Sequence, residues 1–522
     1  MMPLEILQNI LRRIDRLIVF FIIRPFGLLR PKTTSTPTSG TRHNVDLPGP
    51  TMRPLHEFQQ EVLTLFSAPC NIEKMRYMSQ CLKNEYVKKL QSSTACMLPS
   101  FCHTLPTGQE RGTFIALDVG GSTFRVALVE LASRSHNGEE MTIKHMTVNK
   151  INEEVRRLPA AEFFAWMAIK IQDMLHQSGD ERMAQNETIS IGLAWSFPIE
   201  QTGYRGGNIQ PMGKGFKCHE GVLGQDLGLL IEQACQARGV RVRVKAIIND
   251  SSATLLYQAY KDPTTTMSLI LGTGTNAAIY LPVKALGADK FGERDPSWFD
   301  RAEKVIINTE VSMFGKDILV MTRWDEQLNR AHQLPDFQPL EYMTTGRYLG
   351  EIFRLVIAEA VETCQLFGGV MPENILDRYS LDTALLAAIE EDTTMGCISS
   401  AERVQKEFGL LNTPSLAEMS FLRTAVESIS HRATAYMATA VHALWSLEHN
   451  EQDENSKTSV AANGSVVSMY PGFRARCQNY VANIISANQK LSGSTSEHQV
   501  IMQPTHEATI LGTAVAVAIT DE

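Results

Sequence analysis

The chain has 522 residues, of which 43% are hydrophobic, 20% charged and 7% aromatic, and its formal net charge is −8. This composition is typical of a globular protein of roughly two to four domains and excludes a disordered or fibrous chain. It also argues against nucleic-acid binding, since that affinity depends on Lys and Arg neutralising phosphates. Nine cysteines without a C-x-x-C pair favour a reducing compartment and predict neither a disulfide framework nor a zinc site.

Residues 1–30 predict a basic amphipathic helix. The apolar positions recur at steps of three and four, whereas Arg12, Arg13 and Arg16 fall elsewhere on the helix. The uninterrupted apolar run 17–23 is far shorter than the ~20 residues of a membrane-spanning helix. No small-residue cleavage site follows, so a secretory signal is not expected. We expect a cytoplasmic protein with peripheral membrane contact through this segment, on the cytosolic face of mitochondria or another organelle; a helix that caps the protein itself or a partner is the alternative.

Residues 31–54 predict a flexible linker, because five prolines stand among many Thr, Ser and Gly residues. From residue 55 onward, apolar strand candidates alternate with helical stretches, and this alternation predicts α/β lobes.

Two segments suggest an internal duplication. Residues 113–131 and 266–282 each predict a strand, a glycine-containing polar turn and a second strand. Glycines allow backbone N–H groups to approach an anion, so two such turns facing each other would hold the phosphates of one nucleotide. The alternative for either segment alone is an ordinary hairpin.

Asn249 and Asp250 come directly after the apolar run 244–248. Polar residues at the carboxyl end of a strand in an α/β lobe are well placed to face a ligand. Asp250 is therefore a candidate base, and the alternative is the N-cap of the following helix, residues 251–260.

Eight motifs occur together and in order, and as a set they resemble the hexokinase family. They are LDVGGSTFRV (117–126), SFP (196–198), KGF (214–216), IIND (247–250), LGTGTNAA (271–278), INTE (307–310), LEYMTTGRYLGEI (340–352) and NGSVVSMYPGF (463–473). Each motif alone is a weak signal, whereas eight in register are a strong one.

The resemblance implies a duplicated actin-like (ribonuclease H-like) ATPase fold of the α/β class, with two lobes around a cleft. We expect residues 55–249 to form the small lobe, together with a helix at about 506–522, and residues 250–505 to form the large lobe. The implied activity is the first step of glycolysis, the phosphorylation of a hexose at its 6-hydroxyl with ATP and Mg²⁺, glucose being the foremost substrate. A monomer and a homodimer both remain open.

The resemblance also implies roles for individual residues. Asp250 takes the hydroxyl proton, and Lys214 steadies negative charge near the reacting oxygen. Asp118 approaches Mg²⁺ through water, so no direct metal ligand is expected. The sugar-binding set is Ser196, Asn249, Asn308, Glu310 and Glu341. The nucleotide-binding set is Gly120, Gly121, Ser122, Arg125, Gly272, Thr273 and Gly274 at the phosphates, with Gly464 and Ser465 near the adenosine.

The chain departs from the usual form of the family at several supporting positions. Gly213 replaces a Thr that would touch the sugar, and Ala253 replaces a Gly, which we expect to add a methyl group near the cleft. The other departures are Val311, Ser312, Arg347, Asn463 and the segment HEATILGTA (506–514). They raise the alternative of a catalytically weak or inactive, glucose-binding regulatory protein. A general actin-like ATPase is a further alternative, which the sugar-binding set disfavours.

Overall fold

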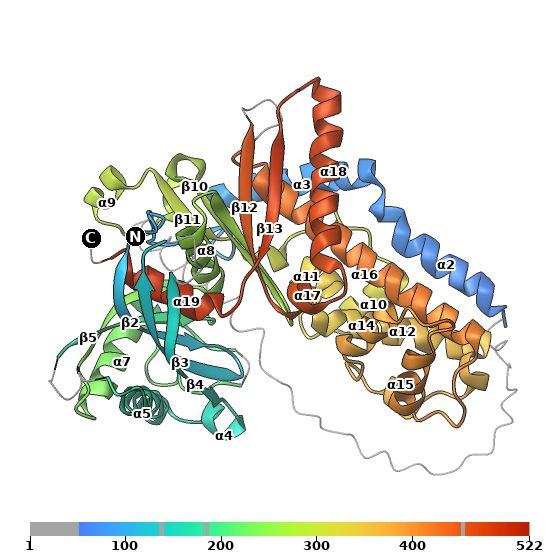
Figure 1. Ribbon diagram of the computed structural model, residues 1–522, viewed down its shortest axis with the longest axis horizontal. Helices are drawn as coiled ribbons and strands as arrows, with labels where there is room; N and C mark the ends of the chain where they lie inside the picture. Colours follow the sequence, from blue (N-terminus) through green and yellow to red (C-terminus); the bar gives the residue numbers. More distant parts are fainter. Residues whose placement is uncertain are drawn as a thin grey trace, which may run out of the picture. The chain divides into compact units, whose positions relative to one another are not determined.

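The computed structural model describes residues 52–134, 140–180, 182, 187–213, 215–449 and 455–520. The segment expected at 1–30, nearly all of the linker expected at 31–54, and Lys214 therefore lie outside the described residues. The chain divides into two units, 1–49 and 50–522, and everything that follows concerns the second (Figure 1).

A five-stranded sheet forms the centre of one half of this unit. Its strand order is β4-β3-β2-β5-β8, with β2 (Arg111–Val119), β3 (Thr123–Ala132), β4 (Met141–Lys150), β5 (Ile189–Trp195) and β8 (Val242–Ile248). Along β2, Ile115 and Leu117 pack in one apolar cluster, which includes α5 (Ala160–Ser178) and α7 (Leu227–Gln236), whereas Phe114 and Ala116 pack in another. Successive side chains of a strand point to opposite faces, so both faces of the sheet are covered.

A six-stranded sheet forms the centre of the other half, in the order β1-β11-β10-β9-β12-β13. Its strands are β1 (Leu98–Pro99), β9 (Thr265–Leu271), β10 (Thr275–Pro282), β11 (Lys304–Asn308), β12 (Ser456–Asn463) and β13 (His498–Pro504). Its last five strands repeat the pattern of the first sheet, an antiparallel meander joined to two parallel strands. The internal duplication and the α/β fold class are thus confirmed.

Most of the helices pack with the six-stranded sheet in one large apolar cluster. They are α2 (Leu55–Ser67), α3 (Ile72–Ser92), α10 (Arg323–Ala331), α11 (Pro339–Thr344), α12 (Gly346–Cys364), α14 (Thr383–Glu391), α15 (Ile398–Phe408), α16 (Leu416–Trp445), α17 (Ser465–Met469) and α18 (Phe473–Ser492). Helices α2 and α3 belong to this cluster, although residues 55–249 were expected in the small lobe. Apolar residues such as Phe58, Phe66 and Tyr86 on these helices are fully buried there. The burial of these large side chains stabilises the packing of α2 and α3 with the six-stranded sheet.

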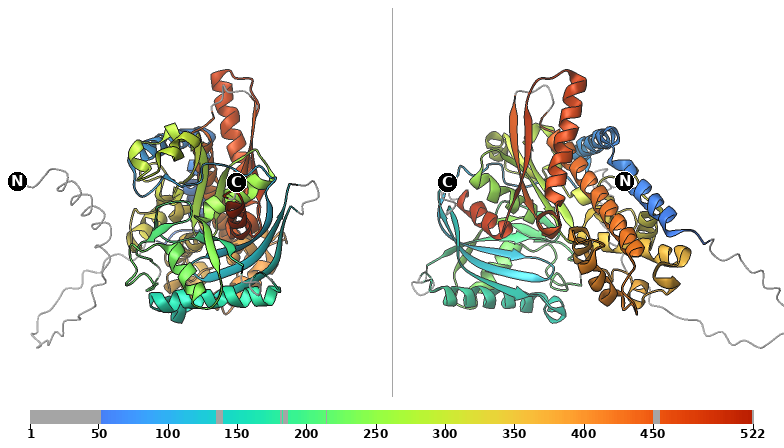
Figure 2. Two further views of the ribbon diagram at one scale, coloured as in Figure 1. Left: turned by 90° about the vertical axis from the view of Figure 1, so that its left-hand side faces the viewer. Right: turned by 45° about the vertical axis from the view of Figure 1, so that its right-hand side comes forward.

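Two helices connect the sheets, because each follows a strand of one sheet and packs on the other. Helix α8 (Asp250–Lys261) follows the last strand of the five-stranded sheet but packs on β9, β10 and β12 of the other sheet. Helix α19 (Ala508–Ala518) follows the last strand of the six-stranded sheet but packs on β2 and β5 of the first. The two helices also pack on each other, and Figures 1 and 2 show α19 beside the strands of the five-stranded sheet.

The contact between α8 and α19 depends on a glycine. A Cβ atom at Gly512 would lie 1.8 Å from the carbonyl oxygen of Ala253. Ala253 itself is fully buried in the apolar cluster of the two helices. The methyl group of Ala253, which was expected near the cleft, is thus packed in the core between these helices.

The replacement Gly512→Ala tests this contact. We expect the free energy of unfolding to fall by about 1 to 3 kcal/mol, because an added methyl group in a packed helix contact forces the backbone apart. Urea unfolding followed by circular dichroism measures the change. The control is Gly203→Ala, where the new Cβ would meet no described atom within 4 Å; equal stability of the two variants would contradict the account.

Candidate active site

Asp250 lies at the first position of α8, and Asn249 alone separates it from the end of β8. The N-cap of this helix is Asn249, whose Oδ1 accepts from Ser251 N at 2.9 Å and from Ser251 Oγ at 2.6 Å. Asn249 thus fills the N-cap position, and the Asp250 carboxylate accepts from Ser251 N at 2.7 Å within the first turn. Ser196 follows β5 and its Oγ donates to Oδ2 of Asp250 at 3.5 Å, so two expected site residues meet at the ends of adjacent parallel strands.

The turn between β2 and β3 contains Gly120, Gly121 and Ser122. Gly120 N donates to the carbonyl oxygen of Thr123 at 3.0 Å, which closes the turn. The carbonyl oxygen of Gly121 accepts from Arg156 Nη2 at 3.0 Å. These bonds fix the backbone of the turn beside the strand that carries Asp118.

Asp118, Arg125 and Glu507 form a charged chain at this turn. Arg125 Nη1 lies 2.9 Å from Glu507 Oε2 and 3.8 Å from Asp118 Oδ2. Burial raises the pKa of Asp118 to about 7; the guanidinium of Arg125 opposes this shift, and the charges of Asp250 and Glu507 add to it. The carboxyl groups of Asp118 and Asp250 therefore interact within one site.

The second glycine turn, Gly272–Thr273–Gly274, joins β9 to β10. Gly272 N donates to the carbonyl oxygen of Gly274 at 2.9 Å. A Cβ atom at Gly274 would lie 2.9 Å from Oε2 of Glu341, and the same carboxylate oxygen accepts from Thr275 N at 3.1 Å. Glu341, expected in the sugar-binding set, thus lies against the expected phosphate-binding turn.

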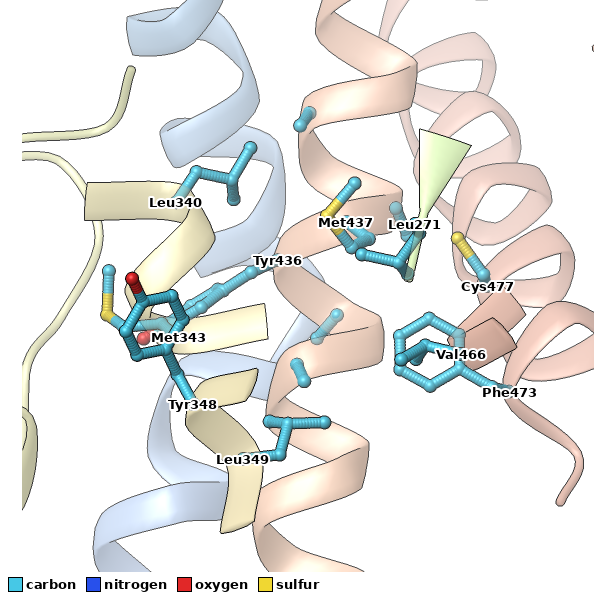
Figure 3. Packing of buried hydrophobic residues seen from close by; sticks show 14 of the residues in the cluster. Leu271, Leu340, Met343, Tyr348, Leu349, Tyr436, Met437, Val466, Phe473 and Cys477 are labelled. Carbon is cyan, nitrogen blue, oxygen red and sulfur yellow. The ribbon is translucent and has the colours of Figure 1, made fainter. Parts of the chain in front are cut away.

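Gly464 and Ser465 pack against the same turn. A Cβ atom at Gly464, where φ is +115°, would lie 2.4 Å from the carbonyl oxygen of Leu271, and one at Gly272 would lie 3.3 Å from Ser465 N. Figure 3 shows Leu271 and Val466 close to Phe473 and Cys477 in the apolar core. The core therefore holds the end of β9 and the start of α17 together, and only glycine allows so close an approach.

A polar network follows the edge of the six-stranded sheet. Asn276 Nδ2 donates to Asn308 Oδ1 at 2.9 Å, and Asn308 Nδ2 donates to Glu310 Oε1 at 2.7 Å. Glu310 adopts the left-handed conformation with φ +51°, which is uncommon for a residue other than glycine and is concentrated at functional sites. Two members of the expected sugar-binding set are thus directly bonded.

Three further residues belong to these clusters but were not predicted: Thr275, Asn276 and Glu507. Thr275 and Asn276 belong to the motif LGTGTNAA, so this motif could have identified both as site residues. Glu507 lies in the segment 506–514, where the chain departs from the family and offered no guide. Lys214 was predicted but lies outside the described residues. Across the part of the chain that the structure describes, no group of three or more His, Cys, Asp or Glu residues could hold a metal ion.

Known proteins are similar to this chain in both sequence and fold. Two family models, both described as hexokinase, match residues 61–260 and 266–519. The hexokinase of Emericella nidulans is 31% identical over 378 residues, 71% of this chain and 73% of that protein. Hexokinase-1 of Saccharomyces cerevisiae is 29% identical over 432 residues, 82% of this chain and 84% of that protein.

A solved structure, the hexokinase of Schistosoma mansoni complexed with glucose, superimposes with a TM-score of 0.72. It is 23% identical in sequence, and the match covers 90% of this chain and 100% of that one, which supports the two-lobe, actin-like fold. This chain belongs to the hexokinase family, a family of sugar kinases.

The replacement Asp118→Asn tests the charged chain. Because the folded state raises the pKa of Asp118 above its ordinary 3.8, ionisation of this carboxyl destabilises the fold, slightly near pH 4 and fully above pH 7. We expect the variant to be more stable than the wild type, and its gain at pH 8 to exceed that at pH 5 by on the order of 1 to 3 kcal/mol. Urea unfolding at both pH values measures the gain, with exposed Asp300→Asn as the control of equal charge change. A gain of equal size at both pH values would contradict the account.

Proposed function

We propose that this protein transfers the terminal phosphoryl group of MgATP to the 6-hydroxyl of a hexose, glucose foremost, with Asp250 as the general base. The observation that carries the proposal is the placement of Asp250. It stands at the amino-terminal end of α8, bonded by Ser196, and its charge acts on buried Asp118. An acceptor for the hydroxyl proton and a carboxyl group on the nucleotide side thus occur at one site, as phosphoryl transfer to an alcohol requires.

Asp250 is assigned a single chemical role, the acceptance of a proton. Its carboxylate accepts the proton of the sugar hydroxyl as that oxygen forms a bond to the terminal phosphorus, and the bond from this phosphorus to the leaving ADP breaks. Ser196 orients the carboxylate through its hydroxyl. Lys214 is assigned to the negative charge near the reacting oxygen, by its place in KGF.

The sugar is assigned to the polar network at the edge of the six-stranded sheet. Asn308 and Glu310 of this network, together with Ser196, Asn249 and Glu341 outside it, are assigned to the ring hydroxyls. A buried acceptor strongly rejects a substrate that lacks its hydroxyl, because that acceptor then stays unpaired. Asn276 positions Asn308 within the network.

The nucleotide is assigned to the two glycine turns. Glycines allow backbone N–H groups to approach a phosphate, and Gly464 and Ser465 pack beside the second turn, where Glu341 contacts Gly274. Asp118 would face Mg²⁺ through water, which suits one carboxyl group and an ion that keeps several waters. When bound, MgATP supplies the phosphoryl group, and the metal neutralises part of its charge.

The replacement Asp250→Asn tests the base. We expect kcat to fall by about 10² to 10⁴, the usual contribution of a general base, while glucose still binds. A coupled assay for ADP measures turnover, and Asp289→Asn on the exposed surface is the matched control. Turnover unchanged in the variant would contradict the role of Asp250. A wild type that binds glucose without transferring phosphate to any hexose would support the regulatory alternative instead.

A second replacement, Gly213→Thr, tests the sugar site by restoring a hydroxyl group. No described atom lies within 4 Å of a Cβ built at Gly213, so the side chain fits. We expect the KM for glucose to fall by up to about tenfold, since one neutral hydrogen bond is worth ~0.5 to 1.5 kcal/mol. Gly213→Val has nearly the same shape without the hydroxyl and is the control; a similar KM in both variants would argue against a sugar contact at this position.

Residues 1–30 are proposed to attach the kinase peripherally to a membrane facing the cytosol. Within the described residues, no helix combines the length and apolar character needed to cross a bilayer. We expect the full chain to sediment with anionic vesicles at low salt, and a chain lacking residues 1–30 to stay in the supernatant. Replacing Arg12, Arg13 and Arg16 with Gln should weaken sedimentation if the polar face contacts lipid headgroups; equal sedimentation of all three proteins would contradict the proposal.

A further inference from the structure

The second glycine turn is held at both ends by neighbouring helices. Glu341 of α11 accepts from Thr275 N at 3.1 Å, directly after the turn. Gly346 N, at the start of α12, donates to the carbonyl oxygen of Gly272 at 2.9 Å. Helices α10, α11 and α12 pack against one another (Figure 1). The orientation of α11 relative to α12 therefore sets the positions of Glu341 and of the turn.

His332, the residue that follows α10, bridges α11 and α12. Its Nδ1 lies 2.9 Å from the hydroxyl of Tyr342 in α11, and its Nε2 lies 3.1 Å from the hydroxyl of Tyr348 in α12. Both tyrosines are 3% exposed. The ring centroid of Tyr342 lies 4.3 Å from that of His332 and 5.0 Å from that of Tyr348. These three side chains form one packed, hydrogen-bonded bridge, which we call the histidine bridge.

The hydrogen bonds around the His332 ring assign its protonation state. Leu334 N donates to Nδ1 at 3.1 Å, and the carbonyl oxygen of Leu334 accepts from the hydroxyl of Tyr342 at 2.7 Å. Nδ1 is therefore assigned as an acceptor and Nε2 as the donor to Tyr348. Burial lowers the pKa of His332; a hydrogen bond with Leu334 opposes this shift, and the charge of Arg347 adds to it. The neutral ring that the bridge requires is thus the form present at physiological pH.

We propose that His332 is a positioning residue for the transfer of phosphate to a hexose, and that it acts through Tyr342 and Tyr348 on Glu341 and the second glycine turn. The inference rests on the proposed function, in which Glu341 contacts the sugar and the turn contacts the nucleotide phosphates. One side chain outside both groups of contacts thus holds a contact of each substrate in place. Such support matters because a displacement of about 1 Å in a site costs on the order of a hundredfold in rate.

The matched replacements His332→Gln and His332→Met test the hydrogen bonds of the bridge. Gln and Met have nearly the same length, but only Gln keeps a donor and an acceptor at its end. We expect the KM for glucose and the KM for MgATP to rise together in the Met variant, by up to about tenfold. The value of kcat should change by less than about twofold, because Asp250 lies outside the bridge. The Gln variant should recover most of both losses, and exposed His56→Met is the control.

Hydrogen–deuterium exchange of the free, full-length protein gives a second readout, which needs no turnover. We expect the amides of residues 271–276 and 341–348 to exchange faster in the Met variant and at nearly the wild-type rate in the Gln variant. Faster exchange confined to residues 332–338 would show that His332 supports only its own loop, and this result would overturn the proposal. Equal KM values in the Gln and Met variants would overturn it as well.

The two readouts separate this proposal from the proposed function. A wild type that forms no sugar phosphate refutes the proposed function, whereas the exchange rates still decide whether His332 holds the turn and Glu341. If His332→Met does not fold, Tyr348→Phe removes the bond from Nε2 while leaving the loop after α10 intact. The same pattern of faster exchange at residues 271–276 is expected there, and its absence would count against the bridge.

Discussion

The exchange of helices α8 and α19 between the two sheets is the constraint on which the rest of the structure depends. Each helix follows the last strand of one sheet and covers the other. Their contact allows no side chain at Gly512, which lies against the backbone of Ala253. Since α8 begins with Asp250 and α19 follows Glu507 directly, the same packing that joins the sheets also places two charged residues of the site.

The duplication explains why the site has two glycine turns. Each sheet begins its repeat with a hairpin, β2–β3 or β9–β10, and each hairpin carries one turn. The two turns are supported differently, however. The first lies beside the charged chain of Asp118, Arg125 and Glu507, whereas the second packs on Gly464 and Ser465 and contacts Glu341. Charged side chains therefore support the first turn, whereas close backbone packing supports the second.

Much of the fold and of the candidate site was predictable from the sequence. Alternating apolar residues around glycine indicated both hairpins, and the position of Asp250 after an apolar run indicated the site. Local patterns could not show that Asn249 is the helix cap, because either residue suits that position. The pairing of Arg125 with Glu507 was also hidden, since 382 positions separate the two residues and only the fold joins them. The packing of α2 and α3 with the six-stranded sheet escaped prediction for the same reason.

We propose that this chain transfers phosphate to a sugar although several of its supporting residues are altered. Phosphorus-31 NMR of the full-length protein with glucose, ATP and Mg²⁺ tests it most directly, because it separates a phosphate ester from free phosphate. We expect a glucose 6-phosphate resonance to grow in step with that of ADP, and neither to grow when glucose is omitted. Release of inorganic phosphate without an ester, or no change in ATP, would contradict the claim.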